Sequence, residues 1–172
     1  MDKIVITGSL GYLGTELCKL YSGEARFKNI VAVDINFVSE RVSQLRDWGI
    51  EFIQASILDE ETIKEIVSDA DVVIHLAGIT DVAYTKTESN LEQDTLIRNT
   101  AIRGTRNIIN NITDDCKLIF PSTHVVYEGF EETKTDIVES EPPCPVLSYS
   151  KGKVQSEVDL MESNKNYVIL RL

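Results

Sequence analysis

The chain has 172 residues, 42% of them hydrophobic, which is enough to build the core of one domain of ordinary size. Its 28 acidic residues outnumber its 17 basic ones, and the net charge of −11 opposes binding to nucleic acid or to an anionic membrane surface. An anionic ligand would therefore need a local binding site. The N-terminal apolar run is too short for a signal peptide and no stretch approaches the length of a membrane span, so we expect a cytoplasmic protein.

The cysteines and histidines do not form a metal-binding pattern. Cys18, Cys116 and Cys144 are odd in number, far apart and without CxxC spacing, so neither a disulfide framework nor a zinc site is indicated. His75 and His124 have no second histidine or cysteine at ligand spacing. We expect no metal site.

Short apolar runs alternate with longer amphipathic stretches along the whole chain. Strands are predicted at residues 3–7, 29–34, 50–55, 71–77, 116–122 and 167–172, and helices at 11–22, 39–49, 59–70, 88–111 and 149–163. Asp59 is a plausible N-cap for the third helix. Such apolar strands, joined by helices, predict an α/β fold with a doubly wound, Rossmann-type parallel sheet of about six strands and helices on both faces.

A loop rich in charge and proline, residues 124–148, separates the fifth strand from the last helix. Its length and composition are typical of an active-site loop rather than of a linker between domains. In a doubly wound sheet, ligands bind at the carboxyl ends of the strands, where this loop and the motifs described next all fall.

Three glycines, Gly8, Gly11 and Gly14, follow the first strand and open the first helix. Without side chains, such a turn can bend sharply and let its backbone approach a pyrophosphate at the helix N-terminus. The spacing is TGxxGxxG rather than GxGxxG, and glycines can simply form a turn, but their place between a strand and a helix favours nucleotide binding.

Asp34 ends the second strand, 20 residues after Gly14. A carboxylate there can accept hydrogen bonds from ribose hydroxyls and would repel a 2′-phosphate, which favours NAD over NADP. The alternative is an exposed residue at a strand end. Arg41 is the nearest basic residue downstream.

Tyr149 and Lys153 lie four residues apart in the last predicted helix, so both side chains can point into one cleft. A phenol is a poor base at neutral pH, but a nearby cation favours the phenolate. The spacing alone is weak, because six tyrosines and many lysines give a fair chance of one such pair. Its context has to support a catalytic role.

The ordered series TGSLGYLG, Asp34, HLAG at 75–78, Asn99 followed by GT at 104–105, PSTHVVY and YSKGK resembles the extended short-chain dehydrogenase/reductase family. The NAD-dependent epimerase/dehydratase branch, whose members modify nucleotide sugars, is the most similar. The resemblance implies that Tyr149 transfers a proton while NAD carries hydride, and that Lys153 binds the nicotinamide ribose and lowers the tyrosine pKa. It also implies that Thr123, rather than the adjacent Ser122, holds the substrate oxygen.

The same resemblance implies a set of NAD contacts along the strand ends. These residues are Gly8, Leu10, Gly11, Tyr12, Leu13, Gly14, Asp34, Ile35, Asn36, Ser56, Ile57, Leu76, Ala77, Gly78, Asn99, Tyr149 and Lys153. The family often has an aspartate where this chain has Ser56, which argues against an adenine contact through that side chain.

Thr123-His124-Val125 replaces the Thr-Asp-Glu that dehydratases of this branch often carry, so we rank an epimerase first. A reductase or dehydrogenase of another carbonyl or hydroxyl substrate stays open, as does a non-catalytic NAD-binding sensor or scaffold. The chain stops directly after its last predicted strand. We therefore expect residues 1–172 to be one NAD-binding domain, truncated before the C-terminal substrate domain, inactive alone, and open to forming a homodimer.

Overall fold

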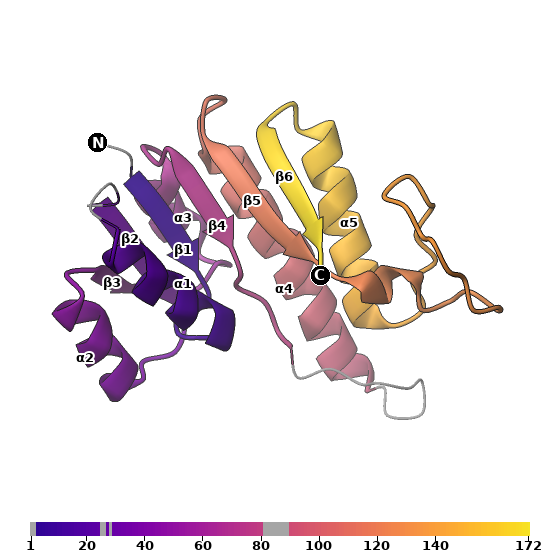
Figure 1. The fold of residues 1–172 in the computed structure, drawn as a ribbon, viewed down its shortest axis with the longest axis horizontal. Helices are drawn as coiled ribbons and strands as arrows, with labels where there is room; N and C mark the ends of the chain where they lie inside the picture. The colour runs from indigo at the N-terminus through magenta and orange to yellow at the C-terminus, as the bar shows by residue number, and fades with distance from the viewer. Residues whose placement is uncertain (1–2, 25–26, 28, 81–89) are drawn as a thin grey trace.

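Six strands form one parallel sheet in the order β3-β2-β1-β4-β5-β6 (Figure 1). The strands are β1 (Lys3–Thr7), β2 (Asn29–Asp34), β3 (Glu51–Gln54), β4 (Val72–His75), β5 (Lys117–Ser122) and β6 (Asn166–Arg171). The structure, a computed structural model, describes residues 3–24, 27, 29–80 and 90–172. The strand order reverses between β1 and β4, which is the topological switch point of a doubly wound sheet. The predicted fold class is confirmed.

Helices connect the strands close to the predicted positions. They are α1 (Tyr12–Ser22), α2 (Ser39–Asp47), α3 (Glu60–Val67), α4 (Leu91–Asn111) and α5 (Ser148–Glu162). Residues 88–89, where the prediction began the fourth helix, lie outside the described residues. Asp59 caps α3 as predicted, because its side chain accepts the backbone N–H of Thr62 at 3.2 Å. A short 3-10 turn, η1 (His124–Tyr127), was not predicted.

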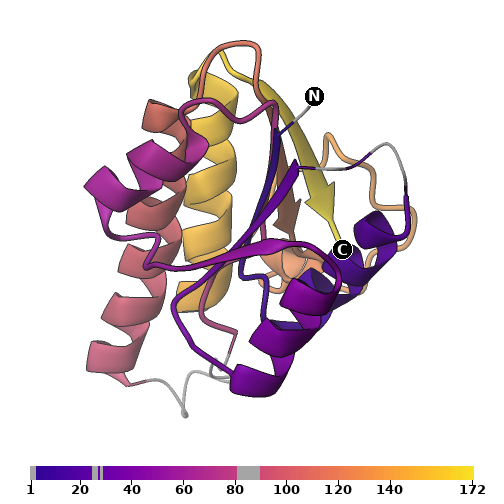
Figure 2. The same cartoon turned by 90° about the vertical axis from the view of Figure 1, so that its left-hand side faces the viewer.

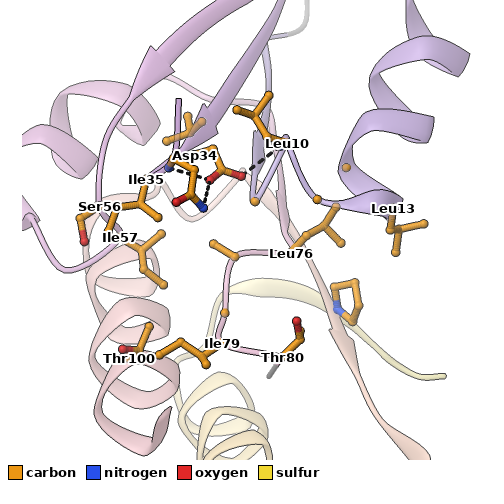
Figure 3. Close-up of a pocket in the computed structure, with 18 of the residues that line it drawn as sticks. Leu10, Leu13, Asp34, Ile35, Ser56, Ile57, Leu76, Ile79, Thr80 and Thr100 are labelled. Carbon is orange, nitrogen blue, oxygen red and sulfur yellow. Dashed lines mark hydrogen bonds between the residues drawn. The ribbon is translucent and has the colours of Figure 1, made fainter. Parts of the chain in front are cut away.

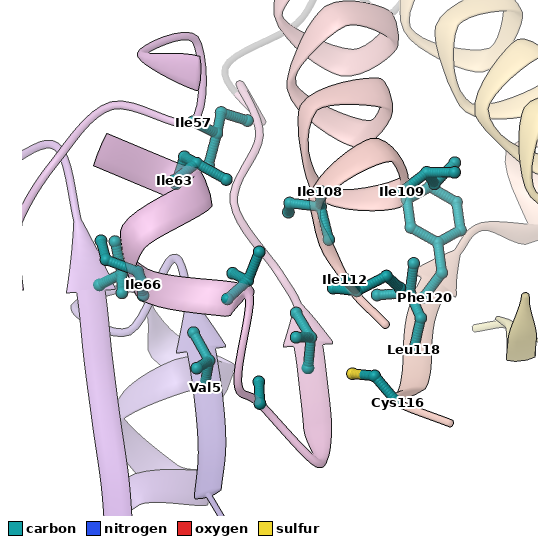
Figure 4. Close-up of a cluster of buried hydrophobic side chains, with 14 of the residues drawn as sticks. Val5, Ile57, Ile63, Ile66, Ile108, Ile109, Ile112, Cys116, Leu118 and Phe120 are labelled. Atoms are coloured by element: carbon teal, nitrogen blue, oxygen red, sulfur yellow. The ribbon is translucent and has the colours of Figure 1, made fainter. Parts of the chain in front are cut away.

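The helices cover both faces of the sheet, α1 and α2 on one side and α3, α4 and α5 on the other (Figure 2). Because successive side chains of a strand point to opposite faces, Val5 and Val73 join the core under α3 to α5, whereas Ile4 and Ile74 join the core under α1 and α2. The first of these cores also contains Phe120 from β5 (Figure 4). Strands buried on both faces explain the nearly continuous apolar runs in the sequence.

Helix α5 packs closely against α4 through a glycine. A Cβ at Gly152 would lie 3.1 Å from the Cβ of Ala101, so a side chain there would crowd the contact between the two helices. Ser156, one turn later, donates its hydroxyl to the carbonyl oxygen of Ala101 at 3.2 Å. These contacts fix α5, and with it Tyr149, relative to the carboxyl edge of the sheet.

Candidate active site

The turn between β1 and α1 requires glycine at two positions. Gly8 has a φ of 70°, and a Cβ there would lie 2.7 Å from the backbone nitrogen of Ala77. A Cβ at Gly14 would overlap the carbonyl oxygen of Gly8. The turn therefore lies directly against the segment after β4 and against the first turn of α1. The free N–H groups of that helical turn, together with the helix dipole, favour an anion.

Asp34 fixes the two loops on either side of the end of β2 (Figure 3). Its Oδ2 accepts the backbone N–H of Leu10 at 3.0 Å, and its Oδ1 accepts that of Asn36 at 3.0 Å. The residue is 8% exposed. The carboxylate is thus held in one orientation at the cavity wall, where it presents negative charge and hydrogen-bond acceptors to a ligand.

Helix α4 helps to hold the loop after β3 in place. The hydroxyl of Ser56 accepts the backbone N–H of Leu58 at 3.2 Å, and the side-chain amide of Asn107 donates to the carbonyl oxygen of Ile57 at 2.9 Å. Gly104 leaves space for the Ile57 side chain. The sequence reasoning missed Asn107. Its place three residues after Gly104, on the same face of the helix, was the one signal that pointed to it.

His75 is a buried structural residue at the end of β4. Its Nδ1 lies 2.8 Å from the hydroxyl of Thr7 and its Nε2 lies 3.2 Å from that of Thr105. Burial lowers the His75 pKa to about 3, with a smaller effect from Lys153, so the ring is neutral at physiological pH. The Thr7 hydroxyl also accepts the backbone N–H of Ala77 at 3.2 Å. The ring therefore positions the segment after β4 beside the glycine turn.

These strand ends surround one cavity of about 770 Å³. All but two of the residues that the sequence predicted for the site line this cavity. The exceptions are Thr123 and Asn99. Further residues that line it are Val33, Val38, Arg41, Ala55, Leu58, Ile79, Thr80, Leu96, Thr100, Pro121 and Ser122. Leu13, Ile35, Leu76 and Ile79 contribute apolar side chains to its lining, with Ile35 beside Asp34 (Figure 3).

Tyr149 and Lys153 reach this cavity from α5. Lys153 donates to the carbonyl oxygen of Pro121 at 2.8 Å, and its ammonium lies 4.6 Å from the centre of the Phe120 ring. Burial lowers the Lys153 pKa to about 8, and the carboxylate of Glu157 opposes this change. Burial raises the Tyr149 pKa, so the phenol is protonated at neutral pH. The spacing of four residues does bring both groups to one wall.

Glu157 joins α5 to the last two strands although it is only 1% exposed. Its carboxylate accepts the hydroxyl of Ser122 and pairs with the guanidinium of Arg171, whose Nη2 lies 2.7 Å away. The hydrogen bond to Glu157 raises the Arg171 pKa. A buried carboxylate requires such partners, and here they fix the end of β5 beside Lys153.

Thr123 does not line the cavity, whereas Ser122 does. Thr123 is the N-cap of η1, and its Oγ1 accepts the backbone N–H of Val125 at 3.2 Å. It is 8% exposed. A threonine in extended backbone just before a helical turn is a favourable cap, which the sequence pattern did not indicate because η1 itself was not predicted.

Asn99, which the sequence predicted for the site, is not among the residues that line the cavity. Its side chain is exposed on α4, and the next residue, Thr100, lines the cavity instead. Successive residues of a helix point about 100° apart, so a shift of one position turns a side chain away from the cavity. The phase of α4 relative to the sheet was not evident from the motif.

Neither a metal-binding cluster nor a membrane-spanning helix occurs in the part of the chain that the structure describes. Residues 3–24, 27, 29–80 and 90–172 contain no group of three or more histidine, cysteine, aspartate or glutamate side chains that could hold a metal ion. No helix within those ranges is long and apolar enough to cross a membrane.

The strand order, the glycine turn at its switch point and the tyrosine and lysine on α5 define a nucleotide-binding domain of the short-chain dehydrogenase/reductase type. The model of the 3-beta hydroxysteroid dehydrogenase/isomerase family matches residues 5–169. The chain belongs to this family, which is part of the extended short-chain dehydrogenase/reductase group.

Known proteins from several branches are similar to the chain. A probable low-salt glycan biosynthesis reductase of Haloferax volcanii is 32% identical over 171 residues, which are 97% of this chain and 51% of the relative. A dTDP-D-glucose 4,6-dehydratase of Dictyostelium discoideum is 25% identical over 174 residues, covering 91% and 39% respectively.

A similar fold is found in the solved structure of UDP-glucuronic acid 4-epimerase from Bacillus cereus, in complex with UDP-glucuronic acid and NAD. The TM-score is 0.80 at 24% identity, and the match covers 98% of this chain and 55% of that one. The chain thus spans about half the length of these relatives, or less.

Proposed function

We propose that this chain is the NAD-binding and proton-transferring part of an enzyme that acts on a nucleotide sugar, with epimerisation as the favoured reaction. One observation carries the proposal: Tyr149 and Lys153 line the same cavity as the glycine turn and Asp34. A nucleotide held by the turn would therefore extend toward a protonated phenol and an ammonium.

The residues present fit NAD. Gly8 and Gly14 allow the turn to pack against the backbone of Ala77 and of Ser9, because a Cβ at either position would collide with backbone atoms. The turn packed in this way presents the N-terminus of α1 to the cavity, where it can approach a pyrophosphate. The fixed carboxylate of Asp34 would accept the adenosine ribose hydroxyls and repel a 2′-phosphate. When bound, NAD supplies the acceptor and donor of hydride.

The raised pKa of Tyr149 determines the direction of proton transfer for which the phenol is ready. It holds its proton at neutral pH and is therefore poised to donate it to a carbonyl oxygen that is being reduced. Abstraction of a hydroxyl proton requires phenolate, which the ammonium of Lys153 would stabilise once its charge faces the phenol. An epimerase needs both directions in successive half-reactions.

A hydroxyl that orients the substrate oxygen has to donate a hydrogen bond to it. The Ser122 hydroxyl donates its hydrogen to Glu157, whereas Thr123 uses its oxygen as an acceptor from Val125 and keeps its hydrogen. This supports Thr123 over Ser122 for the role, even though Ser122 lines the cavity.

The substrate assignment rests on the relatives. Proteins similar to the chain include epimerases, dehydratases and a decarboxylase named for UDP or dTDP sugars. Thr123-His124-Val125 lacks the acidic residues that would assist elimination, which favours epimerisation over dehydration.

A second candidate is an NAD-dependent dehydrogenase of a hydroxylated substrate other than a sugar. The family match over residues 5–169 favours it, because the family is named for oxidation of a 3-beta hydroxysteroid. The roles of Tyr149 and Lys153 are the same in both candidates, and only the second substrate differs.

Binding titrations with NADH and with NADPH, monitored by fluorescence, test the cofactor preference. We expect NADH to bind the 172-residue chain more tightly than NADPH, and Asp34→Ala to remove the preference. Absence of NADH binding would refute the proposal. UDP, dTDP and GDP sugars and a hydroxysteroid are then screened for NADH formation, with Tyr149→Phe as the variant that should bind NADH normally but transfer no hydride. Longer products of the same reading frame are screened in parallel.

A further inference from the structure

The long loop between η1 and α5 is closed at its base by a short paired segment. We call this segment the neck, and it consists of residues 126–129 and 144–150. The backbone N–H of Cys144 donates to the carbonyl oxygen of Val126 at 2.8 Å, and that of Gly129 donates to the carbonyl oxygen of Cys144 at 2.9 Å. A Cβ at Gly129 would lie 2.8 Å from the Sγ of Cys144, so the two segments of the neck are in close contact.

Glu128 occupies the centre of the neck and binds the start of α5. Its Oε1 accepts the backbone N–H of Val146 at 2.9 Å and that of Leu147 at 2.7 Å. The same oxygen accepts the hydroxyl of Ser150, a residue that is fully buried. One carboxylate oxygen therefore joins three donors on both sides of Tyr149 in the sequence.

Helix α5 depends on this carboxylate because it has no N-cap side chain of its own. Leu147 is the N-cap residue, and its side chain cannot accept a hydrogen bond from the first turn. Glu128 instead accepts the N–H groups of the two residues before the helix and the Ser150 hydroxyl in its first turn, and it places a negative charge near the positive end of the helix dipole. Tyr149 is the second residue of that helix.

We propose that Glu128 is a positioning residue for Tyr149, holding the first turn of α5 so that the phenol stays half-buried in the cavity wall. This role rests on the proposed function, in which Tyr149 transfers the proton. The opposite end of the catalytic segment is fixed independently, by the hydrogen bond from Lys153 to Pro121. Loss of Glu128 should therefore displace the phenol while leaving the ammonium in place.

Two effects of the carboxylate have to be separated. Its charge would raise the Tyr149 pKa directly, whereas its hydrogen bonds would do so by keeping the phenol buried. Glu128→Gln removes the charge but keeps an oxygen that can accept the same three hydrogen bonds, and Glu128→Ala removes both. Glu132→Ala is the matched control, since Glu132 is exposed on the same loop.

The experiment uses the 172-residue chain and two measurements. Hydrogen exchange reports on the amides of Val146 and Leu147, and near-ultraviolet titration reports on the Tyr149 phenol, as the difference from the same variant carrying Tyr149→Phe. In Glu128→Ala we expect the two amides to exchange about tenfold faster and the Tyr149 pKa to fall toward its ordinary value. In Glu128→Gln and Glu132→Ala both should stay near wild type.

Equal behaviour of Glu128→Ala and Glu132→Ala would overturn the proposal, as would a Tyr149 titration that moves equally in the alanine and glutamine variants. If Glu128→Ala does not fold, Ser150→Ala decides, because it removes one of the three donors and should move the phenol in the same direction by a smaller amount. NADH affinity is measured in every variant. Absence of NADH binding in the wild-type chain would count against the proposed function, but not against the role of Glu128 in positioning Tyr149.

Discussion

The ammonium of Lys153 lies 2.8 Å from the carbonyl oxygen of Pro121 and so joins the middle of α5 to the end of β5. The hydrogen bond and the Phe120 ring beneath it hold a cation in a place where burial disfavours its charge. A buried lysine of this kind gives the domain a stability that depends on pH in the alkaline range.

Replacement of Lys153 by methionine should reveal this dependence. The Lys153 pKa is about 8 in the folded chain against 10.5 for an unperturbed lysine, so above pH 8 the unfolded chain binds the extra proton. Between pH 7 and pH 9 the free energy of unfolding of the wild-type chain should therefore rise by about 1 kcal/mol relative to Lys153→Met. Urea denaturation at both pH values measures this, and a constant difference between the two proteins would contradict it.

The steric role of Gly8 in the turn can be tested by comparison with a glycine that has a similar φ but open space where a Cβ would lie. Gly8 and Gly49 have φ values of 70° and 71°, and a Cβ at Gly49 would meet nothing within 4 Å. Gly49→Ala should therefore cost about 1–2 kcal/mol, from the left-handed backbone alone. Gly8→Ala should cost about 1–3 kcal/mol more, because its Cβ meets the backbone at Ala77, and it should abolish NADH binding. Equal losses in thermal denaturation would contradict this.

Acid sensitivity should follow from His75. Its pKa is about 3 in the folded chain and near 6.5 in the unfolded one, so the unfolded chain takes up the extra proton as the pH falls through 6.5. From pH 7 to pH 5 the wild-type chain should lose about 2 kcal/mol more stability than His75→Gln. Surface carboxylates with lowered pKa values are the same in both proteins and cancel in the comparison. Parallel stability curves would show that His75 does not titrate in this way.

Ser9 offers a stabilising substitution. Among the described residues its Oγ is the one buried side-chain oxygen or nitrogen without a hydrogen-bond partner. Ser9→Ala should raise the free energy of unfolding by up to about 1 kcal/mol, because it removes an unpaired hydroxyl from the interior. Ser156→Ala is the control, since its equally buried hydroxyl lies 3.0 Å from the carbonyl oxygen of Gly152 and its loss should be destabilising. Denaturation midpoints decide the sign of each change.

The elements that the sequence predicted well depend on local patterns. The strands are marked by apolar runs, the glycine turn by residues whose missing side chains have a direct steric meaning, and the pair Tyr149 and Lys153 by the period of a helix. Each of these signals lies within a few residues of the chain. They were sufficient to predict a doubly wound parallel sheet of about six strands, whereas the strand order was not predicted.

The features that were missed depend on partners distant in the sequence. Glu128 lies 18 residues before Val146, and nothing near it indicates that its carboxylate binds the start of α5. The exposure of Asn99 depends on how α4 is rotated about its axis relative to the sheet. That rotation is set by the packing of α4 against α5 and the sheet. Thr123 could not be recognised as a cap before η1 was known. Such contacts arise only when the whole chain is folded.

The neck also determines how the chain should respond to a protease. Residues 131–140 are exposed along their whole length, and exposed loop tips are preferred sites of cleavage. The two fragments of a chain cut there would still share the ladder between β5 and β6 and the packing of α5 on α4. A nicked molecule should therefore run as one species in gel filtration and separate into two only in denaturant, which makes this loop a suitable place to insert an affinity tag.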